Sequence, residues 1–147
     1  WKTPMEEVRI GTGRLIKEGE GLAILTIGHI GNYAVEVCKE LSRQGIEIAH
    51  YDMRFVKPLD EGLLHGVFSR FSKIITVEDG CVQGGMGSAI LEFMADHHYS
   101  ANVLRLGIPD KVVEHGEQID LHAECGFDPE GIMKAVVQML EPVPKPS

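Results

Sequence analysis

The sequence is poor in aromatic residues and in basic charge. Aromatic residues make up 6% of its 147 positions, and 14 Lys and Arg stand against 22 Asp and Glu, which gives a net charge of -8. A chain without a basic run does not suit the polyanionic surface of nucleic acid or of an anionic membrane. We therefore expect neither of them as a partner.

Cysteine and long apolar runs are scarce as well. Cys38, Cys81 and Cys125 lie far apart and show no C-x-x-C spacing, and an odd number of cysteines is not a disulfide framework. The apolar runs, such as residues 22–27, are much shorter than the ~20 residues that a membrane-spanning helix needs. These absences predict a soluble protein of the reducing cytoplasm.

The sequence begins Trp1-Lys2-Thr3-Pro4 rather than with methionine, and no basic segment followed by an apolar one indicates a signal peptide. We expect it to be cut from a longer chain. Residues 1–10 are predicted to be a linker from a preceding domain, and residues 11–140 to form one domain. Residues 141–147 are predicted to be a disordered tail, because three prolines there prevent a helix.

Apolar, β-branched segments alternate with amphipathic helical segments, which is the pattern of strands joined by crossover helices. The predicted strands are residues 22–27, 46–51, 74–77 and 103–106, with a short edge strand within 9–17. Each of the four is apolar on both faces, as a buried parallel strand must be. The sequence therefore predicts an α/β fold with helices on both faces of the sheet.

Four amphipathic helices are expected around these strands. In the first, Ala34, Val37, Cys38 and Leu41 repeat at helical spacing, so Cys38 is interpreted as a core residue. The other signals are Gly45 at the end of that helix, Asp60 as the N-cap of the second, residues 88–97 as the third, and Asp128 with Pro129 at the start of the last.

Two glycine-rich loops follow strands and open helices, from Gly28 to Gly31 and from Gly84 to Gly87. Backbone N–H groups at such places bind phosphates, but the first loop lacks a dinucleotide fingerprint and the second lacks the Walker lysine. We interpret the first as a tight turn and the second as a docking surface, since glycines let another backbone come close. We expect Gly85→Val to leave the isolated domain folded if Gly85 has a negative φ.

No catalytic or metal-binding set is evident. Cys81 lies near a helix start, yet the carboxylates of Glu78 and Asp79 oppose a low thiol pKa, and Ser88 lies in no G-x-S-x-G motif. The seven histidines match neither H-E-x-x-H nor a zinc-finger spacing. We therefore predict no catalytic, cofactor-binding or metal-binding residue, and a hydrolase using Cys81 or Ser88 has only these isolated residues in its favour.

Three segments together carry a family resemblance: DMRFVKPLD at 52–60, VEDGCVQGGMGSAILEF at 77–93 and LRLGIPDKVVEHG at 104–116. They resemble the carboxyl-terminal, transketolase-type domain of the 1-deoxy-D-xylulose-5-phosphate synthase family, and the resemblance extends over residues 11–140. It implies a three-layer α/β/α fold whose five-stranded mixed sheet has the order 1-3-2-4-5 and an antiparallel first strand. The switch-point rule then predicts a crevice between Gly28–Gly31 and Glu78–Gly80.

The resemblance also implies a function. Enzymes of this family condense pyruvate with glyceraldehyde 3-phosphate and release CO₂, in the biosynthesis of isoprenoids, thiamine and pyridoxal, with thiamine diphosphate and Mg²⁺ as cofactors. The family's diphosphate motif, G-D-G followed by Asn, belongs to an amino-terminal domain and does not occur in this sequence. The domain is therefore expected to be inactive alone and to pack against the preceding domains and against a second subunit of a homodimer.

The docking candidates are Arg54, Glu78, Gly84, Gly85, Gly87 and His115. The alternative is a module that binds a small ligand with the loops Gly28–Gly31 and Gly84–Gly87.

Overall fold

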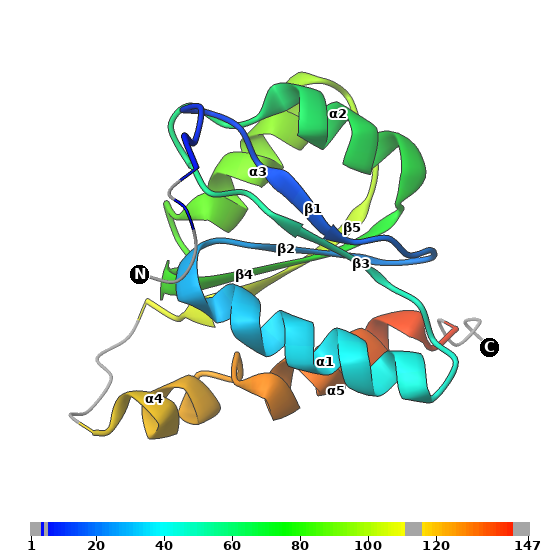
Figure 1. Cartoon of the computed structure of the whole chain (residues 1–147), viewed down its shortest axis with the longest axis vertical. Coiled ribbons are helices and arrows are strands. Elements are labelled where there is room, and N and C mark those ends of the chain that lie inside the picture. The colour runs from blue at the N-terminus through cyan, green and yellow to red at the C-terminus, as the bar shows by residue number, and fades with distance from the viewer. Residues whose placement is uncertain (1–3, 5, 111–115, 143–147) are drawn as a thin grey trace.

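The computed structural model describes residues 4, 6–110 and 116–142, and it shows one sheet between two layers of helices (Figure 1). The strands are β1 (Arg14–Lys17), β2 (Ala23–Thr26), β3 (Ala49–Asp52), β4 (Lys73–Cys81) and β5 (Asn102–Ile108). The helices are α1 (Gly31–Arg43), α2 (Glu61–Arg70), α3 (Met86–Asp96), α4 (Gln118–Glu124) and α5 (Pro129–Leu140), with a 3₁₀ turn η1 (Gly28–Ile30) before α1. None of the helices in these residues is long and apolar enough to cross a membrane.

The sheet has the strand order β1-β3-β2-β4-β5. β1 is antiparallel to β3, and the other neighbouring strands are parallel. This confirms the order and the antiparallel first strand that the family resemblance implied. Figure 1 shows α1, α4 and α5 on one side of the sheet and α2 and α3 on the other. Because the chain leaves β2 towards one side and β4 towards the other, the carboxyl ends of these two strands form the switch point of the fold.

The central strands are buried on both faces, which explains their continuous apolar sequence. Leu22 and Ile24 belong to the core that α1 and α5 cover, whereas Ala23 and Leu25 belong to the core under α2 and α3. All four side chains have no exposed surface. Successive residues of a strand point to opposite faces, so β2 contributes to both cores at once.

The helix ends follow the local signals in the sequence. Gly45 has a φ of +78° just after α1, as a left-handed residue at a helix end does. Asp60 Oδ1 accepts a hydrogen bond from Leu63 N at 2.9 Å, and Asp128 Oδ1 accepts one from Gly131 N at 2.9 Å. The predicted caps of α2 and α5 are therefore confirmed, and Cys38 is confirmed as a core residue.

Several boundaries differ from the sequence-based prediction. α3 begins at Met86, with Gly85 as its N-cap, rather than at Ser88. β4 continues to Cys81, through residues that were assigned to a loop, and residues 46–48 precede β3 rather than form its start. The short helix α4 was not predicted at all. α4 carries His122, which belongs to the candidate functional site.

Candidate functional site

The carboxyl ends of β2 and β4 meet, as the switch-point rule predicts. His29, in η1 after β2, places its Nε2 atom 3.4 Å from Oδ2 of Asp79 at the end of β4. His122 of α4 places its own Nε2 atom 3.4 Å from the same oxygen. The His122 side chain is 4% exposed, that of Asp79 is 25% exposed and that of His29 is 58% exposed. The structure thus brings two histidines to one carboxylate, although their spacing in the sequence predicted no such cluster.

A small hollow of about 110 Å³ adjoins this cluster. It is lined by Asp79, Ile108, Gln118, Leu121, His122, Cys125 and Phe127. The hollow lies beneath α4 rather than between residues 28–31 and 78–80, where the sequence placed the crevice. The sequence offered one signal for α4, since Leu121 and Cys125 lie four residues apart and share a helix face.

A buried carboxylate occupies the amino end of α3. Glu78 is 5% exposed, and its two carboxylate oxygens accept hydrogen bonds from Met86 N at 2.7 Å and Gly87 N at 2.9 Å. These are the backbone N–H groups with which a helix start binds an anion. The chain's own carboxylate has taken that position. The loop therefore does not fit the diphosphate of thiamine diphosphate, nor the phosphate-binding role of the ligand-module alternative.

Close packing within the domain leaves no room for a side chain at two glycines of the same loop, Gly85 and Gly87. A Cβ atom at Gly85 would overlap Oε2 of Glu78 and would lie 2.5 Å from the carbonyl oxygen of Cys81. At Gly87 it would lie 2.6 Å from Oγ1 of Thr76. Gly85 has a φ of -86°, so backbone strain does not require a glycine there. These contacts argue against the expectation that Gly85→Val leaves the domain folded, because a valine side chain would collide with Glu78 and Cys81.

The other docking candidates differ in their surroundings. Gly84 is exposed with a φ of +78°, and its N–H group donates to Oγ of Ser88 at 3.0 Å. Arg54 has a φ of +58°, and its N–H group donates to Oδ1 of Asp52 at 3.1 Å. His115 lies outside the described residues. The docking role of these residues stays a prediction.

Among the described residues, neither candidate nucleophile is hydrogen-bonded to an activating base. Oγ of Ser88 donates to the carbonyl oxygen of Val82 at 2.9 Å and accepts from Nη1 of Arg105 at 2.8 Å. Cys81 is exposed at the end of β4, where Sγ lies 3.7 Å from an amide oxygen, Oε1 of Gln83. In the core, burial raises the pKa of Cys38 to about 11, so that thiol is protonated and unreactive at neutral pH. The hydrolase alternative gains no support.

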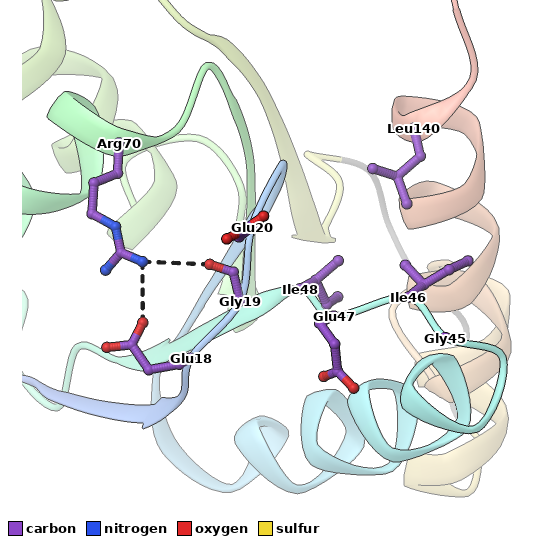
Figure 2. A pocket seen from close by; sticks show the side chains of 9 residues that line it. All are labelled: Glu18, Gly19, Glu20, Gly45, Ile46, Glu47, Ile48, Arg70 and Leu140. Atoms are coloured by element: carbon purple, nitrogen blue, oxygen red, sulfur yellow. Dashed lines mark hydrogen bonds and ion pairs between the residues drawn. The ribbon is translucent and has the colours of Figure 1, made fainter.

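A larger hollow, of about 720 Å³, lies at the opposite end of the sheet (Figure 2). Glu18, Gly19, Glu20, Gly45, Ile46, Glu47, Ile48, Arg70 and Leu140 line it. Nη2 of Arg70 donates to Oε2 of Glu18 at 3.1 Å and to the carbonyl oxygen of Gly19 at 3.4 Å, as the dashed lines in Figure 2 show. Its cation is thus already paired, and ligands of open α/β sheets bind at the other, carboxyl ends of the strands. We do not regard this hollow as the functional site.

His50, in β3, is a buried histidine without a full set of partners. It is 1% exposed; its Nε2 atom lies 2.8 Å from Oγ1 of Thr26, and its Nδ1 atom has no hydrogen-bond partner among the described residues. Burial lowers the pKa of His50 to about 4, and Arg14 lowers it further while Asp52 opposes the shift. His50 is therefore neutral at physiological pH.

This neutral histidine predicts a loss of stability in acid. Between pH 6.5 and about 4 the unfolded chain binds a proton at His50 and the folded chain does not, so the free energy of unfolding falls as the pH falls through this window. The loss at pH 4 is expected to reach at most about 3 kcal/mol. Denaturant unfolding at several pH values measures it, and His50→Gln should flatten the profile. His98→Gln, at an exposed position, is the control, and identical profiles for His50→Gln and wild type would contradict the assignment.

The glycine loop yields a second prediction. We expect Gly85→Ala to lower the free energy of unfolding by about 1–3 kcal/mol, because its Cβ atom displaces the Glu78 carboxylate from the start of α3. Gly66→Ala is the matched control, since a Cβ atom at that helical position meets nothing within 4 Å and should stabilise α2 slightly. Denaturant unfolding of both variants makes the comparison. Wild-type stability of Gly85→Ala would show that the loop has room for a side chain.

Comparison with known proteins places the chain in a family. The transketolase C-terminal domain family matches residues 11–132. The chain is 62% identical over 136 residues to 1-deoxy-D-xylulose-5-phosphate synthase of Cytophaga hutchinsonii, covering 92% of this chain and 21% of that protein. It is 50% identical over 145 residues to the synthase of Bacteroides thetaiotaomicron, covering 98% of this chain and 22% of that protein. The chain thus spans about a fifth of the length of these curated relatives.

Solved structures agree with this assignment. A split gene transketolase, whose structure is described as an "inactive beta4 tetramer", superposes with a TM-score of 0.82 at 29% identity. The superposition covers 94% of this chain and 44% of that one. Transketolase of Campylobacter jejuni superposes with a TM-score of 0.62 over 87% of this chain and 18% of that one, at 19% identity, which supports the fold alone. Because this family matches residues 11–132 and the split gene relative superposes with a TM-score of 0.82, the chain belongs to the transketolase C-terminal domain family.

Proposed function

We propose that this chain is the carboxyl-terminal interaction domain of a 1-deoxy-D-xylulose-5-phosphate synthase and has no complete active site of its own. The observation that carries the proposal is the 62% identity to such a synthase over 92% of this chain, which is only 21% of that enzyme. The parent enzyme would join pyruvate to glyceraldehyde 3-phosphate with loss of CO₂. Its catalytic groups would come from the other four-fifths of its length.

The local chemistry supports an assisting role. When bound elsewhere in the parent enzyme, thiamine diphosphate and Mg²⁺ would supply the carbanion chemistry. In this chain the backbone N–H groups at the start of α3, at Met86 and Gly87, already donate to Glu78 and are not available to a diphosphate. The solved split gene relative, described as an inactive tetramer, supports the idea that part of such an enzyme folds and assembles without activity. The chain's contribution would then be to hold other domains in position.

An apolar surface near the amino end suits such a contact. Four large apolar side chains are exposed there: Val8 by 46%, Ile10 by 73%, Leu15 by 43% and Ile16 by 37%. They lie in or just before β1, the edge strand in Figure 1, which pairs with β3 and with no other described strand. Exposed apolar groups on a sheet edge favour association with another surface. We propose that the domain preceding residue 11 covers this edge.

The tip of the glycine loop is the second proposed contact. Cys81, Gln83 and Gly84 are exposed, whereas the rest of the loop is held from within by Glu78. An exposed glycine, such as Gly84 at this tip, lets another backbone approach closely. We propose that this tip meets another domain or the second subunit of the homodimer.

Reconstitution from two polypeptides tests the proposal. This chain and the remainder of the parent synthase are produced separately, and product formation from pyruvate and glyceraldehyde 3-phosphate is measured with thiamine diphosphate and Mg²⁺. We expect no activity and no cofactor binding by this chain alone, and activity when the two polypeptides are combined. Ile10→Glu should weaken their association at least about tenfold, or about 1.4 kcal/mol, by placing a charge in an apolar contact.

Ile119→Glu is the matched control, because Ile119 is 71% exposed but lies on α4, away from β1 (Figure 1). Saturable micromolar binding of thiamine diphosphate to this chain alone, equivalent to about -8 kcal/mol, would contradict the missing active site. Equal association of the Ile10→Glu and wild-type chains would contradict the proposed contact at β1.

A further inference from the structure

We propose that His29, Asp79 and His122 form a binding site for one divalent transition-metal ion, with Zn²⁺ as the ion that fits best. One ligand atom from each residue lies within 4.8 Å of the other two. The three residues come from η1, β4 and α4, which are far apart in the sequence. The inference is independent of the function proposed above, because it rests only on these side chains.

The distances within the cluster match metal ligation better than hydrogen bonding. Nε2 of His29 and Nε2 of His122 each lie 3.4 Å from Oδ2 of Asp79. A good N–H···O hydrogen bond spans about 2.7–3.2 Å, so both separations are long for one. Two ligands of a tetrahedral zinc ion with bonds of about 2.0–2.1 Å lie roughly 3.3–3.4 Å apart. The two observed separations are therefore compatible with two edges of a zinc tetrahedron, and the third pair of ligand atoms lies within 4.8 Å.

Neighbouring side chains hold the ligands in place. Nδ1 of His122 lies 3.2 Å from the hydroxyl oxygen of Tyr33, and the His122 ring packs against Phe127 with a centroid distance of 4.7 Å. A proton on Nδ1, donated to Tyr33, leaves the lone pair of Nε2 free for a metal. Nε2 of Gln118 donates to Oδ2 of Asp79 at 3.2 Å and orients that carboxylate. Such supporting contacts are typical of metal ligands.

The ligand set selects the class of ion. Two imidazoles and one carboxylate suit Zn²⁺, Co²⁺ or Ni²⁺, whereas Mg²⁺ and Ca²⁺ prefer an all-oxygen set. Three protein ligands leave the fourth tetrahedral position to water or to another donor. Asp79 and His122 also line the hollow of about 110 Å³ beneath α4, which is large enough for a water molecule.

Bound metal would tie α4 to the sheet. α4 is a helix of only seven residues, and a short helix has little stability of its own. An ion held jointly by η1, β4 and α4 would fix that helix over the carboxyl ends of the strands. Because such a site exists only in the folded chain, Zn²⁺ should raise its melting temperature.

A second histidine pair provides an internal control. The rings of His65 and His97 have centroids 4.7 Å apart. Nδ1 of His65 is 2.7 Å from the hydroxyl oxygen of Tyr99, and Nδ1 of His97 is 3.0 Å from the carbonyl oxygen of Phe93. Within the described ranges, no carboxylate joins this pair to make a three-ligand group.

Zinc binding by the chain tests the site. Metal-free protein is titrated with Zn²⁺ against a chromophoric chelator, and with Co²⁺ while its visible absorption is recorded. We expect one Zn²⁺ per chain with a Kd below about 10 μM, the intense bands of four-coordinate Co²⁺, and a rise in melting temperature. His29→Gln and Asp79→Asn should weaken binding by at least about 100-fold, and Tyr33→Phe by roughly tenfold. His97→Gln should bind as the wild type does.

His29→Gln and Asp79→Asn carry the test because their side chains are partly exposed and their loss leaves the core intact. His122→Gln is added, with its fold checked by circular dichroism, since that ring is buried. The absence of stoichiometric zinc binding by the wild type would overturn the proposal. Zinc binding that is unchanged in His29→Gln and Asp79→Asn would also overturn it, and so would zinc binding that is lost only in His97→Gln. Either result would place the ion at another site.

Discussion

The hydrogen bonds from the start of α3 to the buried carboxylate of Glu78 organise the carboxyl edge of the sheet. A buried charge is costly unless it is paired or well hydrogen-bonded, and here two backbone N–H groups and the positive end of α3 compensate it. This arrangement leaves no space for a side chain at Gly85, whereas at Gly87 the space is taken by Thr76 and Arg105. It also places an acid where another protein of similar topology would place a phosphate. The Glu78 interaction therefore accounts both for the glycine at position 85 and for the poor fit to a cofactor.

Asp79, which follows Glu78 in β4, lies on the opposite face of the sheet. Side chains of successive strand residues alternate between faces, so Glu78 reaches α3 while Asp79 reaches His29 and His122. The Glu-Asp pair thus fixes a helix on one side and gathers the proposed metal ligands on the other. Both roles lie at the switch point between β2 and β4. At this edge of the sheet, the anion-binding position at the start of α3 is occupied by the carboxylate of Glu78.

The sequence predicted those features that depend only on neighbouring residues, such as strands, helix caps and helix ends. The apolar strand β2, the left-handed Gly45 and the caps Asp60 and Asp128 were all evident from adjacent residues. The start of α3 was misplaced because its cap comes from Glu78, a residue outside the helix and its usual capping position. The histidine cluster was missed for a similar reason, since its ligands meet only through the sheet topology. The helix that carries His122 is short and gives a weak periodic signal.

Hydrogen exchange at the amides of Met86 and Gly87 tests most directly whether the Glu78 carboxylate organises this edge. In the wild type both amides should be protected, because each donates to that carboxylate. Glu78→Gln removes the charge with little change in shape, and should accelerate exchange at both amides and lower the free energy of unfolding by about 1–3 kcal/mol. Glu92→Gln, at an exposed position of α3, should change neither quantity. Unchanged protection of both amides in Glu78→Gln would contradict the account.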